Sequence, residues 1–264
     1  MKIASLINYL ETMAPLHYQE SYDNAGLITG HPDWDISGVM ISLDATEAVI
    51  DEAITLGCNV VVSHHPIVFK GLKKINGYSY VERAMIKAIK HDIALYAIHT
   101  NLDNVYENGV SGEICARLEL INTTILSPNL AHDPSGNVGS GMIGDIQSSM
   151  EMSAFLQYIK KKMQVSTLKH TKQLDRPVKK VAVCGGSGSF LLSRAISAQA
   201  DVYISADFKY HEYFDAEDHL MIVDIGHYES ERFTIDLLYE RIRNNFSNFA
   251  AHCTKINTNP VKYF

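Results

Sequence analysis

Short apolar runs that alternate with helical patterns constrain the fold of this chain more than any other feature. The first three runs cover residues 38–43, 60–63 and 93–98. Between them lie two segments with helical spacing, the first marked by Val49 and Ile54 and the second at residues 81–90. A strand, helix, strand, helix, strand order is typical of a parallel sheet with right-handed crossovers. We therefore expect an α/β protein.

The second part of the chain follows the same order. Apolar runs are found at residues 181–184, 202–205 and 220–225, the last expected to be the final strand. Helical segments are expected at 190–199 and 211–217, and Leu238, Ile242 and Phe246 predict a C-terminal helix. We predict two similar α/β halves with mixed, largely parallel sheets, covering residues 1–127 and 128–264, with no inserted third domain.

Histidine and carboxylate side chains follow three of the predicted strands, where ligands bind in open parallel α/β sheets. The candidates are His64, His65, His99, Asp103, His227 and Glu231. Imidazole and carboxylate are the ligands that zinc, iron and manganese take at hydrolytic sites. Adjacent residues of an extended segment point to opposite sides, so His64 and His65 are expected to reach different metal ions. Asp103 or Glu231 would bridge two ions roughly 3.5–4 Å apart.

Each candidate alone also has an ordinary explanation. A His-His pair at a strand end is more often exposed or hydrogen-bonded than metal-bound, Asp103 can cap a turn, and a helix dipole favours Glu231 near an N-terminus. Their joint occurrence at three strand ends favours a metal site, which we expect in the cleft between the halves. His99 is expected to orient a ligand or act as a general base. His211 and Asp207 follow another strand and could line the same cleft.

Two local patterns suggest roles for backbone amides. Asp44 precedes a helical segment and resembles the first residue of a capping box. Residues 185–188, Gly-Gly-Ser-Gly, lie between a strand and a helix, where they could bind phosphate or simply form a tight turn, and Lys209 is a further phosphate candidate. The glycine segment matches neither the dinucleotide-binding nor the P-loop pattern, so we assign no nucleotide cofactor.

Composition excludes several classes of protein. The formal net charge of −7 makes nucleic acid an improbable partner, although a local basic pocket stays compatible with it. The four cysteines form no C-x-x-C pair, which argues against a thiolate zinc site and a dithiol redox motif. There is no apolar stretch of about 18 residues and no signal-peptide pattern. We expect a cytoplasmic protein without a membrane partner.

Several motifs, in this order and spacing, are shared with a known family. They are Tyr22-Asp23-Asn24-Ala25-Gly26-Leu27, Asp44-Ala45-Thr46, Ser63-His64-His65-Pro66, His99-Thr100-Asn101-Leu102-Asp103, Val183-Cys184-Gly185-Gly186-Ser187-Gly188, Asp207-Phe208-Lys209-Tyr210-His211 and Gly226-His227-Tyr228-Glu229-Ser230-Glu231. Along almost its whole length the chain resembles the GTP cyclohydrolase I type 2 homolog family, also called YbgI-like or Nif-three-like proteins. It departs at Tyr22, where the family usually has Trp, and at Ala206, where Gly is usual.

The resemblance implies a dinuclear metal centre with two divalent ions per subunit, either zinc, iron or manganese. The implied ligands are His64, His65, Asp103, His227 and Glu231. The resemblance also implies a ring-shaped homohexamer whose metal sites face an internal cavity. Some members carry an extra domain in mid-chain, for which 264 residues leave no room.

Three functions are compatible with such a site. The first is a metal-dependent hydrolase that acts on a small molecule, a purine nucleotide such as GTP, and opens its ring at C8. Metal coordination brings the pKa of water to about 7, and His99 or His211 would move the proton. The second is a non-catalytic metal-binding or regulatory hexameric ring, and the third a metal-dependent phosphoesterase or nucleic-acid processing factor.

Overall fold

The computed structural model describes residues 1–263, which form two compact units. The first unit contains residues 1–102 and 234–262, and the second contains residues 103–233 with Tyr263. The boundary predicted at residues 127 and 128 does not coincide with this division. Residues 121–128 form a strand that pairs inside the second unit, and the chain returns to the first unit after residue 233.

Within the described residues, the first unit contains a five-stranded sheet with the order β1-β4-β3-β2-β11. Its strands are β1 (Gly26–Thr29), β2 (Gly38–Ser42), β3 (Val60–Ser63), β4 (Ala94–Ala97) and β11 (Ala250–Cys253). The last four are parallel to their neighbours, and only β1 is antiparallel. Every residue of β2, β3 and β4 is buried, which explains their continuous apolar sequence.

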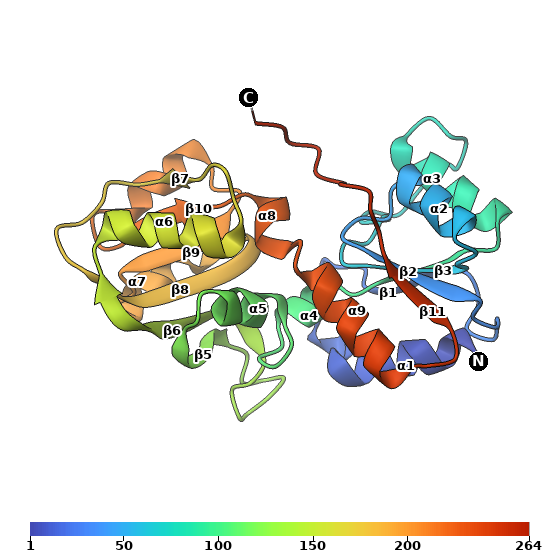
Figure 1. Ribbon diagram of the computed structural model, residues 1–264, viewed down its shortest axis with the longest axis horizontal. Coiled ribbons are helices and arrows are strands. Elements are labelled where there is room, and N and C mark those ends of the chain that lie inside the picture. Colours follow the sequence, from blue (N-terminus) through green and yellow to red (C-terminus); the bar gives the residue numbers. More distant parts are fainter. Residues whose placement is uncertain (264) are drawn as a thin grey trace. The chain divides into compact units, whose positions relative to one another are not determined.

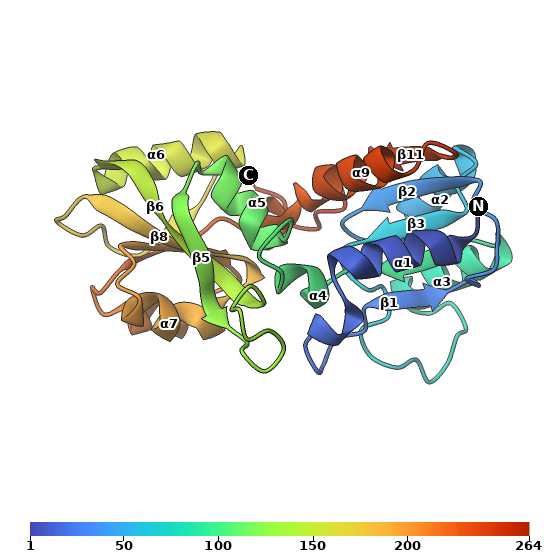
Figure 2. The ribbon, with the colours of Figure 1, turned by 90° about the horizontal axis from the view of Figure 1, so that it is seen from below.

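Helices cover both faces of this sheet (Figures 1 and 2). The helices are α1 (Ile3–Met13), α2 (Glu47–Thr55), α3 (Tyr80–Lys90) and α9 (Thr234–Asn245), with a short 3₁₀ turn, η1 (Leu16–Tyr18). Met40, Val61 and Leu95 alternate with their strand neighbours to face the layer of α2 and α3. The opposite layer contains α1 and α9, with Leu238 and Ile242 of α9 fully buried.

The described part of the second unit contains a six-stranded sheet with the order β5-β6-β8-β9-β10-β7. Its strands are β5 (Ile121–Pro128), β6 (Gly139–Met150), β7 (Lys169–His170), β8 (Val178–Ser187), β9 (Val202–Ala206) and β10 (Met221–Asp224). The neighbours β8, β9 and β10 are parallel, while the other pairs are antiparallel. This sheet is therefore less parallel than we expected.

Two helical layers also cover the second sheet (Figure 2). Val181 and Val183 of β8 pack in the layer of α5 and α6, whereas Ala182 and Cys184 pack in the layer of α7. The remaining elements are α4 (Thr100–Asp103), α5 (Val110–Arg117), α6 (Met152–Met163), η2 (Ser189–Leu191), α7 (Leu192–Ser197), η3 (Tyr210–Ala216) and α8 (His227–Glu231).

The predicted class, a mixed α/β fold with two sheets, is confirmed. The expectation that residues 220–225 form the last strand is wrong, because β11 follows helix α9 and pairs with β2. Among residues 1–263, no helix combines the length and apolar character that crossing a membrane requires.

Candidate metal-binding residues

His64 and His65 lie directly beyond the end of β3 in the first unit. The backbone bends there, with the amide of His64 donating to the Ser42 carbonyl (3.2 Å) and that of His65 to the Leu43 carbonyl (2.9 Å). The two rings lie 4.9 Å apart, centroid to centroid. The expectation that they point to opposite sides is therefore wrong, because residues 64 and 65 are no longer part of the extended strand.

Both rings are held through Nδ1. Nδ1 of His64, which is fully buried, lies 2.8 Å from the carbonyl oxygen of Ile98, and a carbonyl can only accept. Nδ1 of His65 lies 2.9 Å from Oδ1 of Asp44. A proton on Nδ1 puts the ring's lone pair on Nε2, which is how imidazole is prepared to bind a metal. Asp44 is thus not the helix cap we predicted, and Thr46 caps α2 instead.

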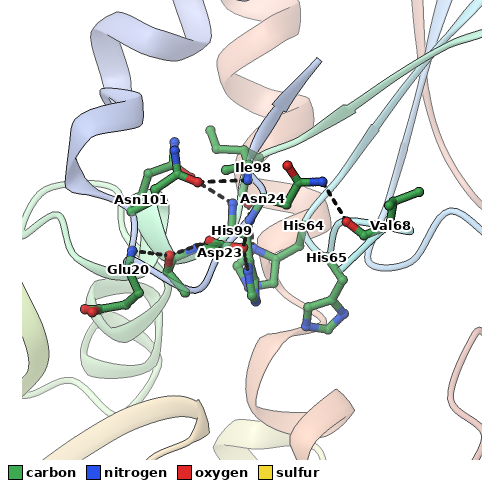
Figure 3. Close-up of polar contacts among 12 residues, drawn as sticks. Glu20, Asp23, Asn24, His64, His65, Val68, Ile98, His99 and Asn101 are labelled. Carbon is green, nitrogen blue, oxygen red and sulfur yellow. Dashed lines mark hydrogen bonds and ion pairs between the residues drawn. The ribbon is translucent and has the colours of Figure 1, made fainter. Parts of the chain in front are cut away.

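His99 joins these two rings from the neighbouring strand (Figure 3). It follows β4, which pairs in parallel with β3, so the chain leaves both strands at the same edge of the sheet. One ligand atom of each of His64, His65 and His99 lies within 4.8 Å of those of the other two. A cluster of this kind can hold a divalent transition-metal ion, with His64 and His65 as ligands and His99 beside them.

A buried carboxylate, Asp23, fixes His99. Its Oδ1 accepts from His99 Nδ1 (2.7 Å), and its other oxygen accepts from the amide of Thr100 (3.0 Å) and from the Thr100 hydroxyl. Burial alone would raise the pKa of Asp23, but the hydrogen bonds from His99 and Thr100 outweigh it and lower the pKa to about 2. Asp23 is therefore ionised at neutral pH and keeps His99 in one orientation, as the role of general base requires.

His227 and Glu231 form the corresponding pair in the second unit. They begin and end the one-turn helix α8, directly after β10, as their four-residue spacing predicts. Nε2 of His227 lies 3.0 Å from Oε2 of the buried Glu231. Ligand atoms bound to one ion are roughly 3.0–3.4 Å apart when metal–ligand bonds are about 2.0–2.2 Å long. The pair therefore fits the edge of a metal coordination sphere.

A second carboxylate, Asp207, holds the other side of the His227 ring. Its Oδ2 lies 2.7 Å from Nδ1 of His227. Burial would lower the pKa of His227, but the hydrogen bonds and negative charges of Asp207 and Glu231 outweigh it and raise the pKa to about 11. The surroundings of this ring thus favour positive charge, as a cation site does.

Asp103 lies at the end of α4 and is the first residue of the second unit. Burial first, and then the negative charges of Asp103 and Glu231, raise the pKa of the Cys184 thiol to about 12. Both carboxylates therefore act on the same buried sulfur. The role of Asp103 as a metal ligand stays a prediction.

The glycine segment at residues 185–188 makes room for the Glu231 carboxylate. Gly185 and Gly186 belong to strand β8, so the expected strand-to-helix loop begins later than predicted. The amide of Gly186 donates to the Ser230 hydroxyl (2.9 Å), so this amide is already used within the protein. A Cβ on Gly186 would lie 2.2 Å from Oε1 of Glu231, so a residue with a side chain here would force this carboxylate or the backbone to move.

Two weaker sequence candidates lie on or beside η3. His211 is exposed, and its ring lies against Tyr210 (5.2 Å) and Phe214 (6.3 Å). Lys209 is 86% exposed and lies 3.8 Å from the Glu212 carboxylate. The catalytic role of His211 and the phosphate-binding role of Lys209 stay predictions.

A model of the family described as Duf34/NIF3 (NGG1p interacting factor 3) matches residues 1–260. The chain belongs to this family. Proteins named GTP cyclohydrolase 1 type 2 homolog are among its relatives. The one from Campylobacter jejuni is 31% identical over the whole of both chains. The one from Clostridium acetobutylicum is 29% identical over 98% of this chain and 94% of its own.

Solved structures of family members have the same fold. A Staphylococcus aureus protein superimposes with a TM-score of 0.90 at 28% identity, covering 100% of this chain and 99% of that one. Reduced HcgD from Methanocaldococcus jannaschii superimposes with a TM-score of 0.81 at 27% identity, covering 97% and 98%. The resemblance inferred from the sequence motifs is therefore confirmed.

Proposed function

We propose that this DUF34/NIF3 protein is a metal-dependent hydrolase of a purine nucleotide such as GTP. The proposed metal ligands are His64, His65, Asp103, His227 and Glu231, and the proposed general base is His99. The assembly of these ligands into one two-metal centre stays a prediction, as does the homohexamer.

The observation that carries the proposal is a shared arrangement of four histidines. Nδ1 of each ring lies 2.7–2.9 Å from an oxygen acceptor, supplied by Ile98 for His64 and by carboxylates for His65, His99 and His227. Hydrogen bonding of the far ring nitrogen to a carboxylate or carbonyl is what orients metal-binding imidazoles in proteins.

Divalent ions at such a site would polarise the scissile bond and bring the pKa of water close to 7. The chain's own groups then have defined tasks. Asp44 and Asp207 hold the rings of His65 and His227 in place. His99, kept in orientation by Asp23, would accept a proton from water and return it to the departing nitrogen. Two such hydrolyses, one at each C8–N bond of the purine, consume two waters and release C8 as formate.

The names of the relatives from Campylobacter jejuni and Clostridium acetobutylicum support GTP as the first substrate to test. We propose to purify the protein with its native metals and to measure formate and phosphate release from GTP and from a panel of phosphoesters. His65→Ala and Glu231→Ala test the ligands. His91→Ala is the matched control, because His91 is exposed at the end of α3.

Formate release that is lost in both ligand variants and kept in His91→Ala is the expected result. Phosphate release in its place would contradict the cyclohydrolase and favour a phosphoesterase. Bound metal without turnover of any substrate would contradict an enzyme and favour a non-catalytic metal-binding role.

A further inference from the structure

Two exposed aromatic rings lie beside the histidine cluster of the first unit. Tyr22 is 62% exposed and Phe69 is 46% exposed. Their ring centroids are 6.3 Å apart with an angle of 30° between the ring planes. The two rings therefore offer an exposed aromatic surface that a planar ligand can cover.

Hydrogen bonds fix the two loops that carry these rings. The side-chain amide of Asn24 donates to the carbonyl of Val68 (2.7 Å), which ties the loop of Tyr22 to the loop of Phe69. Asn24 and Val68 are labelled in Figure 3, where this bond joins the two loops beside His64 and His65. Asp23, the neighbour of Tyr22, is anchored by Thr100. Both aromatic rings are thus carried by loops with fixed backbones.

The same rings adjoin the proposed general base. The Phe69 ring lies 5.7 Å from the His99 ring, centroid to centroid, with an interplanar angle of 76°. The platform formed by Tyr22 and Phe69 is therefore in direct ring contact with His99. Three exposed lysines, Lys70, Lys73 and Lys74, follow Phe69 in the same loop. They supply local positive charge in a chain of net charge −7 and favour an anionic ligand.

We propose that Tyr22 and Phe69 form a stacking platform for the aromatic base of a nucleotide, and that this platform positions the base against His99. The inference rests on the proposed function, because it identifies how a purine substrate would be held. Stacking of a base on an aromatic side chain contributes about 1–3 kcal/mol and requires only a π face from the ligand.

The test compares two ligands that carry the same phosphate. Binding of GMP, and of ribose 5-phosphate as the matched ligand without a base, is measured by calorimetry on the full-length protein. The variants are Tyr22→Leu, Phe69→Leu and the conservative Tyr22→Phe. Tyr78→Leu is the control, because Tyr78 is 87% exposed and belongs to the same long connection between β3 and α3.

The expected result is a loss of GMP affinity of about 5- to 150-fold in each platform variant, which corresponds to about 1–3 kcal/mol. Ribose 5-phosphate affinity is expected to stay unchanged, and Tyr22→Phe and Tyr78→Leu to bind GMP like the wild type. Unchanged GMP binding in both leucine variants, absence of GMP binding by the wild type, or equal losses for both ligands would overturn the proposal.

Two further measurements separate this inference from the hydrolase proposal. Metal content is expected to be equal in all variants, because neither Tyr22 nor Phe69 is among the proposed metal ligands. Base-dependent GMP binding without GTP turnover would leave the platform standing and contradict the hydrolase. A change of oligomeric state in the leucine variants, seen by light scattering with unchanged GMP affinity, would contradict the platform and assign the rings to a subunit contact.

Discussion

Gly186 offers the sharpest test of the proposed role of Glu231. It has a φ of +63°, a conformation that costs a residue with a side chain about 1–2 kcal/mol. An added Cβ would lie 2.2 Å from Oε1 of Glu231, and Cβ contacts under 3.0 Å are essentially never found. In Gly186→Ala the two atoms must therefore separate by at least 0.8 Å, the difference between 3.0 and 2.2 Å.

This displacement is large on the scale of metal coordination. Metal–ligand distances are confined to within about 0.2 Å of their ideal values. A carboxylate moved by several times that tolerance no longer binds in the same geometry. Removing a residue that only hydrogen-bonds to a metal ligand typically weakens metal binding by about 10- to 100-fold. Gly186→Ala displaces a proposed ligand itself, so we expect it to weaken metal binding by at least as much.

The assay is competition against a chelator of known affinity, followed by metal analysis. Gly57→Ala is the matched control, because Gly57 also has a positive φ, +71°, but an added Cβ would meet no atom within 4 Å. Both variants should lose thermal stability by a few degrees, since each carries the same backbone strain. Equal metal affinity in Gly186→Ala and Gly57→Ala would refute the assignment of Glu231 as a ligand.

Two further predictions concern the aspartates that hold the histidines, and a third concerns the core. Asp44→Asn and Asp207→Asn should each lower metal affinity by about 10- to 100-fold in the same competition assay, and unchanged affinity would contradict their orienting role. The pKa of Asp23 is lowered from 3.8 to about 2 on folding. The ionised carboxylate therefore stabilises the folded protein fully above pH 3.8, and this contribution is lost as the pH falls through 2. Wild-type protein should lose about 1–2 kcal/mol more stability over this interval than Asp23→Asn, and equal losses in acid melts would contradict the pKa assignment. Leu238→Ala should cost about 2–5 kcal/mol in urea unfolding because Leu238 is fully buried, while Leu56→Ala, at a residue 46% exposed, should cost far less.

The sequence predicts the fold where a local pattern is strong. The strands β2 and β3 can be predicted because burial on both faces demands continuous apolar residues. Strand β11, Ala250–Cys253, has no such pattern. It is a strand because it pairs with the edge of β2, a contact between distant parts of the chain that a local sequence pattern does not show. The long strand β6 contains three glycines, at positions 139, 141 and 144, which weaken any strand pattern.

The sequence also predicts only some of the residues of the candidate site. The histidines could be found from the sequence because each follows a strand end. Their carboxylate partners could not, because Asp23, Asp44 and Asp207 lie 76, 21 and 20 residues from His99, His65 and His227, respectively. The turn residues around Asp23 and the helix-cap pattern around Asp44 favoured local roles. One sequence signal could have indicated these histidine–aspartate pairs. It is the combination of histidines at neighbouring strand ends with aspartates in turns that precede them.

Metal content decides whether the histidines and Glu231 bind divalent ions. We propose to dialyse the wild-type protein, His65→Ala, Glu231→Ala and the control His91→Ala against the same metal-buffered solution and to determine bound metal per chain by mass spectrometry. We expect stoichiometric divalent metal, about two ions per chain, in the wild type and in His91→Ala, and a clear loss in the other two variants. Absence of stoichiometric metal from the wild type, or equal metal in all four proteins, would contradict this expectation.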